Sequence, residues 1–247
     1  MTPSPLLQLL PWVEETIRKS IGSLTDRVEA LIHMAPKDAV VAAEMLTGLA
    51  SLIDDPDQRA RALGVAASAF TVGKRQDRAE VHLDEAERLA ASSTTKAEIL
   101  ARRAHYHHHQ KDWRRLRDTV RAGLAYLEDD TSLAADCIRS RLHSQAAIPA
   151  LYLDRDPLAS ARHSLAAMQH PATSDTTCKA ALSNLAAALG LLDPKTAHDF
   201  LDRVYTWRQR DNASRADYFV AWIDGVVRAS PKLRPGSTTR PCMSCHW

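Results

Sequence analysis

The chain has 247 residues, a formal net charge of +2, 45% hydrophobic and 25% charged residues, and eight glycines. This composition is ordinary for a soluble globular protein, and the small net charge gives no argument for a nucleic-acid or membrane partner. No apolar run approaches the roughly 18 residues that a membrane-spanning helix needs. Four cysteines are too few for a disulfide framework in a chain of this length, and the first residues lack the basic start of a signal peptide. We therefore expect a cytoplasmic protein.

Scarce glycine, abundant Ala, Leu, Arg and Glu, and the absence of alternating apolar positions predict helix throughout. Three Asp-Pro pairs, which begin at Asp55, Asp156 and Asp193, place a capping carboxylate before a proline at the first helical position. Thr95 and Glu98 fit a capping box at another helix start. We predict about twelve helices, near residues 4–20, 24–34, 37–53, 56–72, 76–91, 96–110, 113–127, 132–153, 157–169, 176–191, 194–208 and 214–230.

Helix–turn–helix units recur along the chain. Residues 75–86 and 112–123 enter their helices in the same way, and Leu116 lies 37 residues after Ala79. Small residues let two helices approach closely while bulky ones fill the space between them. One unit has this order of small and bulky residues at Leu63, Ala66, Ala67, Phe70, Ala79, Leu83 and Ala86. Later units keep parts of it at Leu100, Ala104, Trp113, Leu116, Val120 and Gly123, and at Leu185, Ala197, Leu201 and Val204.

This order resembles the tetratricopeptide repeat, over roughly residues 56–210. The resemblance implies an all-α, right-handed α-solenoid of antiparallel helix pairs. Two features depart from the family pattern: His107 stands where Tyr or Phe is usual, and the unit near Ala161 follows Leu116 by 45 residues. A generic alanine-rich bundle is the alternative. We predict N-terminal helices over 1–55 that pack on the solenoid, repeats with a capping helix over 56–230, and a flexible tail over 231–247.

A histidine-rich, basic segment is the candidate partner-binding site. In the repeat interpretation Arg102, His105, His108 and His109 project toward the concave groove, where such solenoids bind ligands, and Arg115 adds to the positive charge. These residues favour an acidic peptide or helix, a phosphate, or a nucleic-acid backbone. His105 also has metal-pair spacing with His108 and with His109, although no carboxylate is well placed. A solvated helix end without a ligand is the alternative.

The C-terminal end contains Cys242 and Cys245, followed directly by His246, in a C-x-x-C-H string. This spacing is typical of covalent haem attachment, which needs an exported protein, and it also supplies part of a zinc site. If the three side chains bind zinc, a fourth ligand must come from elsewhere. The alternative is an unstructured tail whose thiols have no role.

The chain has no Walker loop and no G-x-G-x-x-G, H-E-x-x-H or G-x-S-x-G motif. We predict a non-enzymatic adaptor or regulatory subunit, without a cofactor, that captures a segment of another protein in its concave groove. One alternative is a metal- or thiol-dependent regulator that uses Cys242, Cys245 and His246. Another is a nucleic-acid-contacting protein that uses the basic stripe at residues 102–121.

Overall fold

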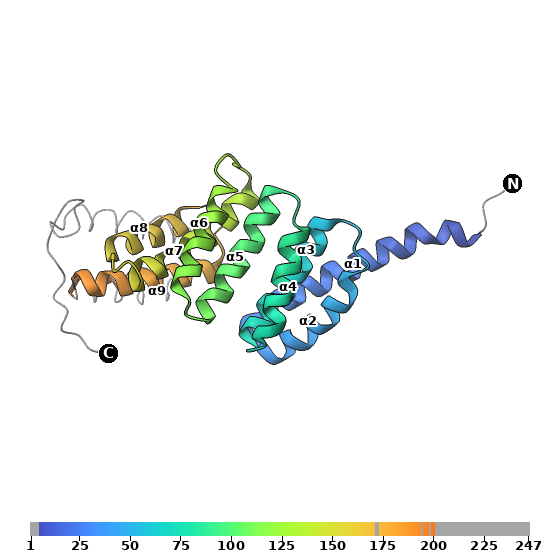
Figure 1. Ribbon diagram of the computed structural model, residues 1–247, viewed down its shortest axis with the longest axis horizontal. Helices are drawn as coiled ribbons and strands as arrows, with labels where there is room; N and C mark the ends of the chain where they lie inside the picture. The colour runs from blue at the N-terminus through green and yellow to red at the C-terminus, as the bar shows by residue number, and fades with distance from the viewer. Residues whose placement is uncertain (1–4, 171–172, 194, 198, 201–247) are drawn as a thin grey trace. The chain divides into compact units, whose positions relative to one another are not determined.

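The structure is a computed structural model that describes residues 5–170, 173–193, 195–197 and 199–200 (Figure 1). These ranges are all-α and contain no β-strand, which confirms the predicted fold class at this level. No helix in them combines the length and the apolar character needed to span a membrane. The main helices are α1 (Pro5–Met34), α2 (Pro36–Ala50), α3 (Pro56–Val72), α4 (Gln76–Leu89), α5 (Ser93–His109), α6 (Trp113–Ala125), α7 (Leu133–Tyr152), α8 (Pro157–Gln169) and α9 (Asp175–Leu192).

The helices that follow the Asp-Pro pairs at Asp55 and Asp156 begin where the sequence predicts. The Asp55 carboxylate accepts the N–H groups of Asp57 and Gln58 at 2.9 and 3.1 Å, and α3 starts at Pro56. The Asp156 carboxylate accepts the N–H of Ala159 at 2.9 Å, and α8 follows. An N-capping oxygen satisfies N–H groups that have no partner inside the helix, and this fixes the helix start.

Two local predictions are wrong. The first is the break between predicted helices 4–20 and 24–34, because α1 runs unbroken through residues 20–24. Within it, the Thr25 hydroxyl donates to the Ile21 carbonyl. Helix α5 is capped by Ser92, whose hydroxyl oxygen accepts the Thr95 N–H at 3.2 Å, and Thr95 is therefore already inside the helix. Glu98, the other half of the predicted capping box, forms ion pairs with arginines. The predicted helix 214–230, the tail 231–247 and most of helix 194–208 lie outside the described residues.

The described chain divides into two compact units, each with its own apolar core. The first unit comprises Met1–Asp112 with Ala125–Glu128, and the second comprises Trp113–Leu124 with the residues from Asp129 onward. Phe70, Leu46 and Leu83 are among the largest fully buried side chains of the first core. Leu185 and Phe200 have the same role in the second.

In the first unit, α3 lies between α1 and α5, so these three helices form a row. Helix α2 packs against α1 and α3, and α4 packs against α3 and α5, which gives a second row (Figure 1). Helices α1 and α2 thus pack on α3. The small and bulky residues of the repeat pattern are all buried here: Leu63, Ala66, Ala67, Phe70, Ala79, Leu83 and Ala86.

Polar contacts between helices of the first unit recur at one sequence offset. In four hydrogen-bonded pairs, three between side chains and one between a carboxylate and a backbone N–H, the two residues lie 34 positions apart. When the partners in successive contacts are separated by the same number of residues, the two segments run side by side in a fixed register. The pairs are Glu44–Arg78, Asp57–Ala91, Arg61–Thr95 and Ser68–Arg102.

The turns after α3, α5 and α7 share a basic residue in the left-handed region: Lys74, Lys111 and Arg155, with φ of 60°, 57° and 53°. In the first two turns a backbone N–H donates five residues back, from Arg75 to Phe70 and from Asp112 to His107. His107 therefore occupies the position of Phe70, and it is buried in the same way. This places a histidine where the family pattern prefers an aromatic residue.

In the second unit, α7, α8 and α9 all pack against one another. The Ser140 hydroxyl of α7 donates to the Ala167 carbonyl of α8 at 2.7 Å. The Asn184 amide of α9 donates to the Ser144 carbonyl of α7 at 2.9 Å. These hydrogen bonds fix three helices whose contact surfaces are otherwise built mainly from alanine and leucine.

Candidate binding site in the first unit

The predicted site residues lie on two helices that belong to different units. Arg102, His105, His108 and His109 lie on α5 in the first unit, whereas Arg115 lies on α6 in the second unit, where it is exposed. The structure thus brings four of the five together on one helix. The predicted metal ligands Cys242, Cys245 and His246 lie outside the described residues.

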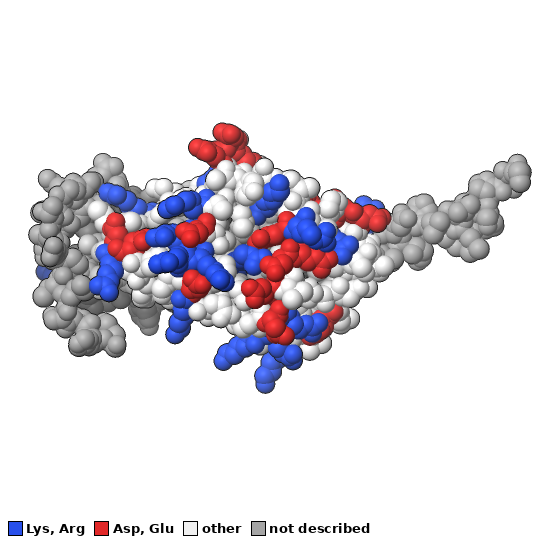
Figure 2. All heavy atoms as spheres, viewed as in Figure 1, with Lys and Arg blue, Asp and Glu red and all other residues white. Residues whose placement is uncertain are grey.

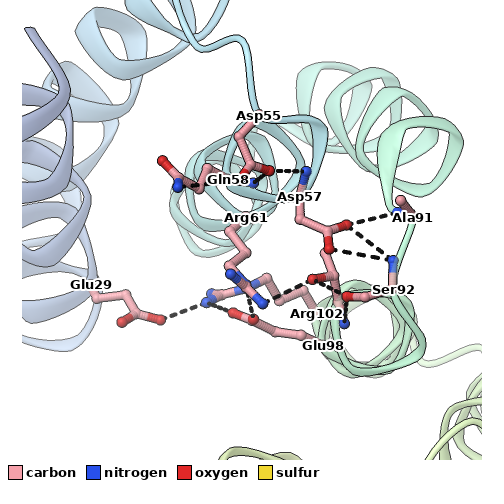
Figure 3. Close-up of polar contacts among 10 residues, drawn as sticks. Glu29, Asp55, Asp57, Gln58, Arg61, Ala91, Ser92, Glu98 and Arg102 are labelled. Carbon is pink, nitrogen blue, oxygen red and sulfur yellow. Dashed lines mark hydrogen bonds and ion pairs between the residues drawn. The ribbon is translucent and has the colours of Figure 1, made fainter. Parts of the chain in front are cut away.

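Arg102 is buried and paired within the first unit. Its side chain is 8% exposed, and its Nη2 donates to Glu29 Oε1 at 2.6 Å and to Glu98 Oε1 at 2.9 Å (Figure 3). Burial alone would lower the pKa of Arg102, but attraction to Glu98 and Glu29 outweighs it and raises that pKa. The guanidinium therefore joins α5 to α1. Binding a partner through Arg102 would first require these ion pairs to break.

The same network ties α3 to the start of α5. Arg61 Nε donates to Glu98 Oε2 at 3.1 Å, and Arg61 Nη2 donates to Thr95 Oγ1 at 2.9 Å (Figure 3). The Asp57 carboxylate accepts the N–H groups of Ala91 and Ser92 at 2.7 and 3.2 Å. Although burial acts to raise the pKa of Asp57, hydrogen bonds from Ser92 and Ala91 lower it. Charged groups thus fix the register of α3 against α5.

A groove of about 470 Å³ lies beside this network, between α1 and the segment that leads into α3. Its apolar lining includes Ile21, Ile53 and Leu52, and the Leu52 side chain is 54% exposed. The other lining residues are Arg18, Gly22, Thr25, Asp26, Asp54, Asp55, Gln58, Arg61 and Ala62. The groove therefore combines apolar surface with side chains of both charges, a composition that suits a peptide segment.

The charge of this lining is more acidic than basic. Asp26, Asp54 and Asp55 contribute three carboxylates, against the guanidinium groups of Arg18 and Arg61. Arg61 already binds Glu98 and Thr95, so part of the positive charge is used inside the unit. A ligand with a positive charge is favoured in such a groove.

Gly22 of α1 keeps the groove open. A Cβ atom built at Gly22 would meet no heavy atom within 4 Å. The residue is helical and exposed, so neither backbone strain nor packing requires glycine there. A larger side chain at position 22 would project into open space that includes the groove.

Three of the predicted site residues cluster at the C-terminal end of α5. His105 Nε2 and His109 Nε2 lie 3.2 Å apart, and the ring centroids are 4.6 Å apart in an edge-to-face arrangement. Burial, and then the nearby charges of His109, His108, His33 and Arg102, lower the pKa of His105 to about 3. Burial also lowers the pKa of His108 and of His109. These rings are neutral at pH 7 and bring no positive charge for an acidic partner.

An exposed apolar row follows α2. Val41 and Met45, one turn apart on α2, are 63% and 60% exposed, and Met34 and Leu52, beyond the two ends of the helix, are exposed as well. Exposed apolar side chains that lie together often mark contacts between proteins. Leu52 also lines the groove.

The groove residues were not among the predicted site residues. Asp55 caps α3 as predicted, but both Asp54 and Asp55 also line the groove. Leu52 and Ile53, directly before these carboxylates, fall within the predicted helix 37–53, whereas α2 ends at Ala50. No signal in the sequence therefore indicated that they line a groove. No local signal shows that Arg61 faces α5, because its partners lie 34 and 37 residues away.

The residues that the structure describes contain no group of three or more metal-ligating side chains that could hold an ion together. Comparisons with known protein families, with curated proteins and with solved structures find no match for this chain.

Proposed function

We propose that the protein is a non-catalytic interaction module that captures a short segment of a partner protein in the groove between α1 and α3. The observation that carries this proposal is the groove itself, which has a volume of about 470 Å³ and a lining of both apolar and charged residues. A segment of a few residues fills a space of this size. An adaptor or regulatory subunit needs this kind of surface.

The lining favours a partner segment that presents an apolar side chain beside a basic one. The apolar side chain would be buried against Ile21, Ile53 and Leu52. The basic side chain would pair with Asp26 or Asp54. The predicted acidic partner rested on Arg102 and the α5 histidines, and those groups are either paired internally or neutral at pH 7.

A tetratricopeptide-like solenoid is the finer fold that we propose with this function. Polar pairs 34 residues apart support it, as do the turns of shared conformation that follow α3 and α5. In such a solenoid the first helices of successive pairs line one face, where ligands bind. Helices α1, α3 and α5 would be those helices, and the groove lies between two of them.

The nucleic-acid alternative has less support. Arg102 and Arg103 belong to the predicted basic stripe, but Arg102 pairs with two glutamates and Arg103 pairs with Asp84 and Glu87. On the face shown in Figure 2, positive and negative side chains of the described residues are interspersed. A phosphate backbone is bound by a continuous positive surface, because each contact releases counterions.

The test uses a substitution that fills the groove without disturbing the fold. In Gly22→Leu the new side chain enters open space on an exposed helix position. Gly48→Leu on α2 is the matched control, because Gly48 is also exposed and its Cβ would also meet nothing within 4 Å. A displayed library of random short peptides is selected on the wild-type protein, and the affinities of the selected peptides are then measured for all three proteins.

We expect the selected peptides to combine apolar and basic residues. Gly22→Leu should weaken them at least tenfold, or about 1.4 kcal/mol, while Gly48→Leu leaves affinity unchanged. Equal affinity for the wild type and Gly22→Leu would reject the groove. A loss with Gly48→Leu alone would assign binding to the apolar row on α2 instead.

A further inference from the structure

We propose that His105 and His109 form a two-imidazole site for a divalent transition metal of the zinc class at the C-terminal end of α5. The two residues are one helical turn apart, and their Nε2 atoms lie 3.2 Å from each other. This site is separate from the groove, and its occupancy does not depend on whether the groove binds a peptide.

The separation of the two nitrogens fits a shared metal ion. Zinc binds imidazole nitrogens at about 2.0–2.1 Å in tetrahedral geometry, which puts two such ligands about 3.3–3.4 Å apart. The observed 3.2 Å therefore requires little movement of His105 or His109. The same i, i+4 spacing on one helix face holds zinc in the H-E-x-x-H motif. Water would fill the remaining coordination positions, because the described residues supply no third side chain that could bind the same ion.

The protonation state also suits metal binding. Burial and the neighbouring histidines lower the pKa of His105 to about 3, and burial and His33 lower the pKa of His109. Both rings are thus neutral at pH 7, and only neutral imidazole binds metal. A neutral imidazole that binds metal through Nε2 carries its one proton on Nδ1, so binding by these two rings releases no net proton.

The position at the end of a helix adds a favourable electrostatic contribution. His109 is the last residue of α5, at the negative end of the helix dipole. The guanidinium of Arg102, which acts on His105, is compensated by Glu29 and Glu98. A cation at His105 and His109 therefore meets little opposing charge. The zinc class is favoured because imidazole is a preferred ligand of Zn²⁺, Cu²⁺ and Ni²⁺.

The test is calorimetric titration of the full chain with zinc chloride, in a Cys242→Ser/Cys245→Ser background that removes the C-terminal thiols. His109→Gln is the main variant, because His109 is exposed and its replacement leaves the core unchanged. His108→Gln is the matched control on the same turn, and His163→Gln examines the other close imidazole pair, His143–His163. Repeating the titration in buffers of different ionisation enthalpy measures the protons released. Thermal melting with and without zinc gives a second readout, since a ligand of the folded state stabilises it.

We expect one zinc per chain, bound without proton release, with a dissociation constant at least tenfold higher in His109→Gln and unchanged in His108→Gln and His163→Gln. Zinc should raise the melting temperature of the Ser background and not that of His109→Gln. The proposal is overturned if the Ser background binds no zinc, if His109→Gln binds it as tightly, or if His163→Gln is the variant that loses it. Proton-releasing binding that is lost with Cys242 and Cys245 would assign the metal to thiolates instead.

Discussion

The most instructive single residue is Arg102. The sequence places it among basic and histidine residues, and this composition predicts a ligand-binding cation. In the structure its charge is balanced by Glu98, four residues earlier, and by Glu29, which lies 73 residues away. The i, i+4 partner was visible in the sequence, but the distant one was not, because it depends on α1 packing beside the row of α3 and α5. Local composition therefore could not distinguish a binding arginine from a structural one.

A substitution at Arg102 is expected to reduce stability. Arg102→Met keeps the length of the side chain but removes the ion pairs of residue 102 with Glu29 and Glu98. Loss of one partner of a buried pair costs about 3–5 kcal/mol, and the partial exposure of Glu29 places the expected loss near 2–3 kcal/mol. Urea denaturation followed by circular dichroism measures the change.

The double variant Arg102→Met/Glu98→Gln is the control for this pair. It should be less destabilised than the sum of the two single variants, because both single changes break the same Arg102–Glu98 ion pair. Additive losses would show that the two side chains do not interact energetically. Arg102→Glu would place three carboxylates together and would therefore report on folding instead of on partner binding.

At the scale of the helix, the sequence predicts starts better than breaks. The predicted ranges 56–72 and 157–169 agree with α3 and α8, because a carboxylate before proline both caps and starts a helix. The break predicted before residue 24 is absent. An exposed glycine costs a helix only about 1 kcal/mol, and the packing of α1 on α2 and α3 overcomes this cost. The start of α5 was misplaced because Ser92 and Thr95 are both capping residues, and only burial of Thr95 against Arg61 decides between them.

The same substitution in two helices should have opposite effects on stability. At Gly64 of α3 a Cβ would lie 2.7 Å from Ile99 Cδ1 and 2.9 Å from Arg102 Cδ. Ile99 is fully buried and Arg102 is anchored by ion pairs, so neither side chain can move freely. Overpacking of this kind costs about 1–3 kcal/mol, which exceeds the gain of about 1 kcal/mol in helix propensity.

Gly64→Ala should therefore lower the free energy of unfolding by about 1 kcal/mol. Gly48→Ala on α2, where a Cβ meets nothing within 4 Å, should raise it by up to about 1 kcal/mol. Chemical denaturation of the two variants beside the wild type gives both values. Stabilisation by Gly64→Ala would mean that α3 and α5 are not in close contact at this position.

At the scale of the whole molecule, the histidines make both units sensitive to acid. In the second unit, His143 Nδ1 of α7 lies 3.2 Å from His163 Nδ1 of α8, and the His143 ring stacks on His170. Burial, followed by the charges of His163, His170 and Arg139, lowers the pKa of His143 to about 4. Asp136 faces His170 and partly offsets the effect of burial on the pKa of His170.

Stability should therefore fall between pH 7 and pH 5. A histidine whose pKa is lowered on folding binds fewer protons in the folded state, so its contribution is complete above its ordinary pKa of about 6.5. For His143 this contribution is lost as the pH falls from 6.5 toward 4. We expect a loss of about 1–2 kcal/mol from this residue by pH 5.

Urea denaturation of the wild type and His143→Gln at pH 7 and pH 5 measures this contribution. The variant should lose less stability over that range, by about the same 1–2 kcal/mol. The range ends at pH 5 so that protonation of the ion-paired carboxylates contributes little. Parallel pH dependence of the two proteins would contradict the assignment to His143.

At this scale the all-α class and the helix pairs of the first unit follow from composition, capping and the order of small and bulky residues. The division after Asp112 did not follow from them. In the turn there, Lys111 has a left-handed backbone conformation, as Lys74 has in the turn after α3. The local sequence therefore does not distinguish a turn inside a unit from a turn between units. The groove could not be predicted either, because its lining comes from α1 and from residues more than 25 positions later in the chain.

The constant offset of 34 residues between paired side chains has a consequence for divergence. A residue inserted in a turn between these helices lengthens a loop and leaves the register inside each helix unchanged. A single residue inserted inside α5 between Thr95 and Arg102 would turn the rest of that helix by about 100°, so Arg61 and Ser68 could not both keep their partners. Gaps in an alignment of homologues should therefore fall in the turns and outside the paired segments of α3 and α5.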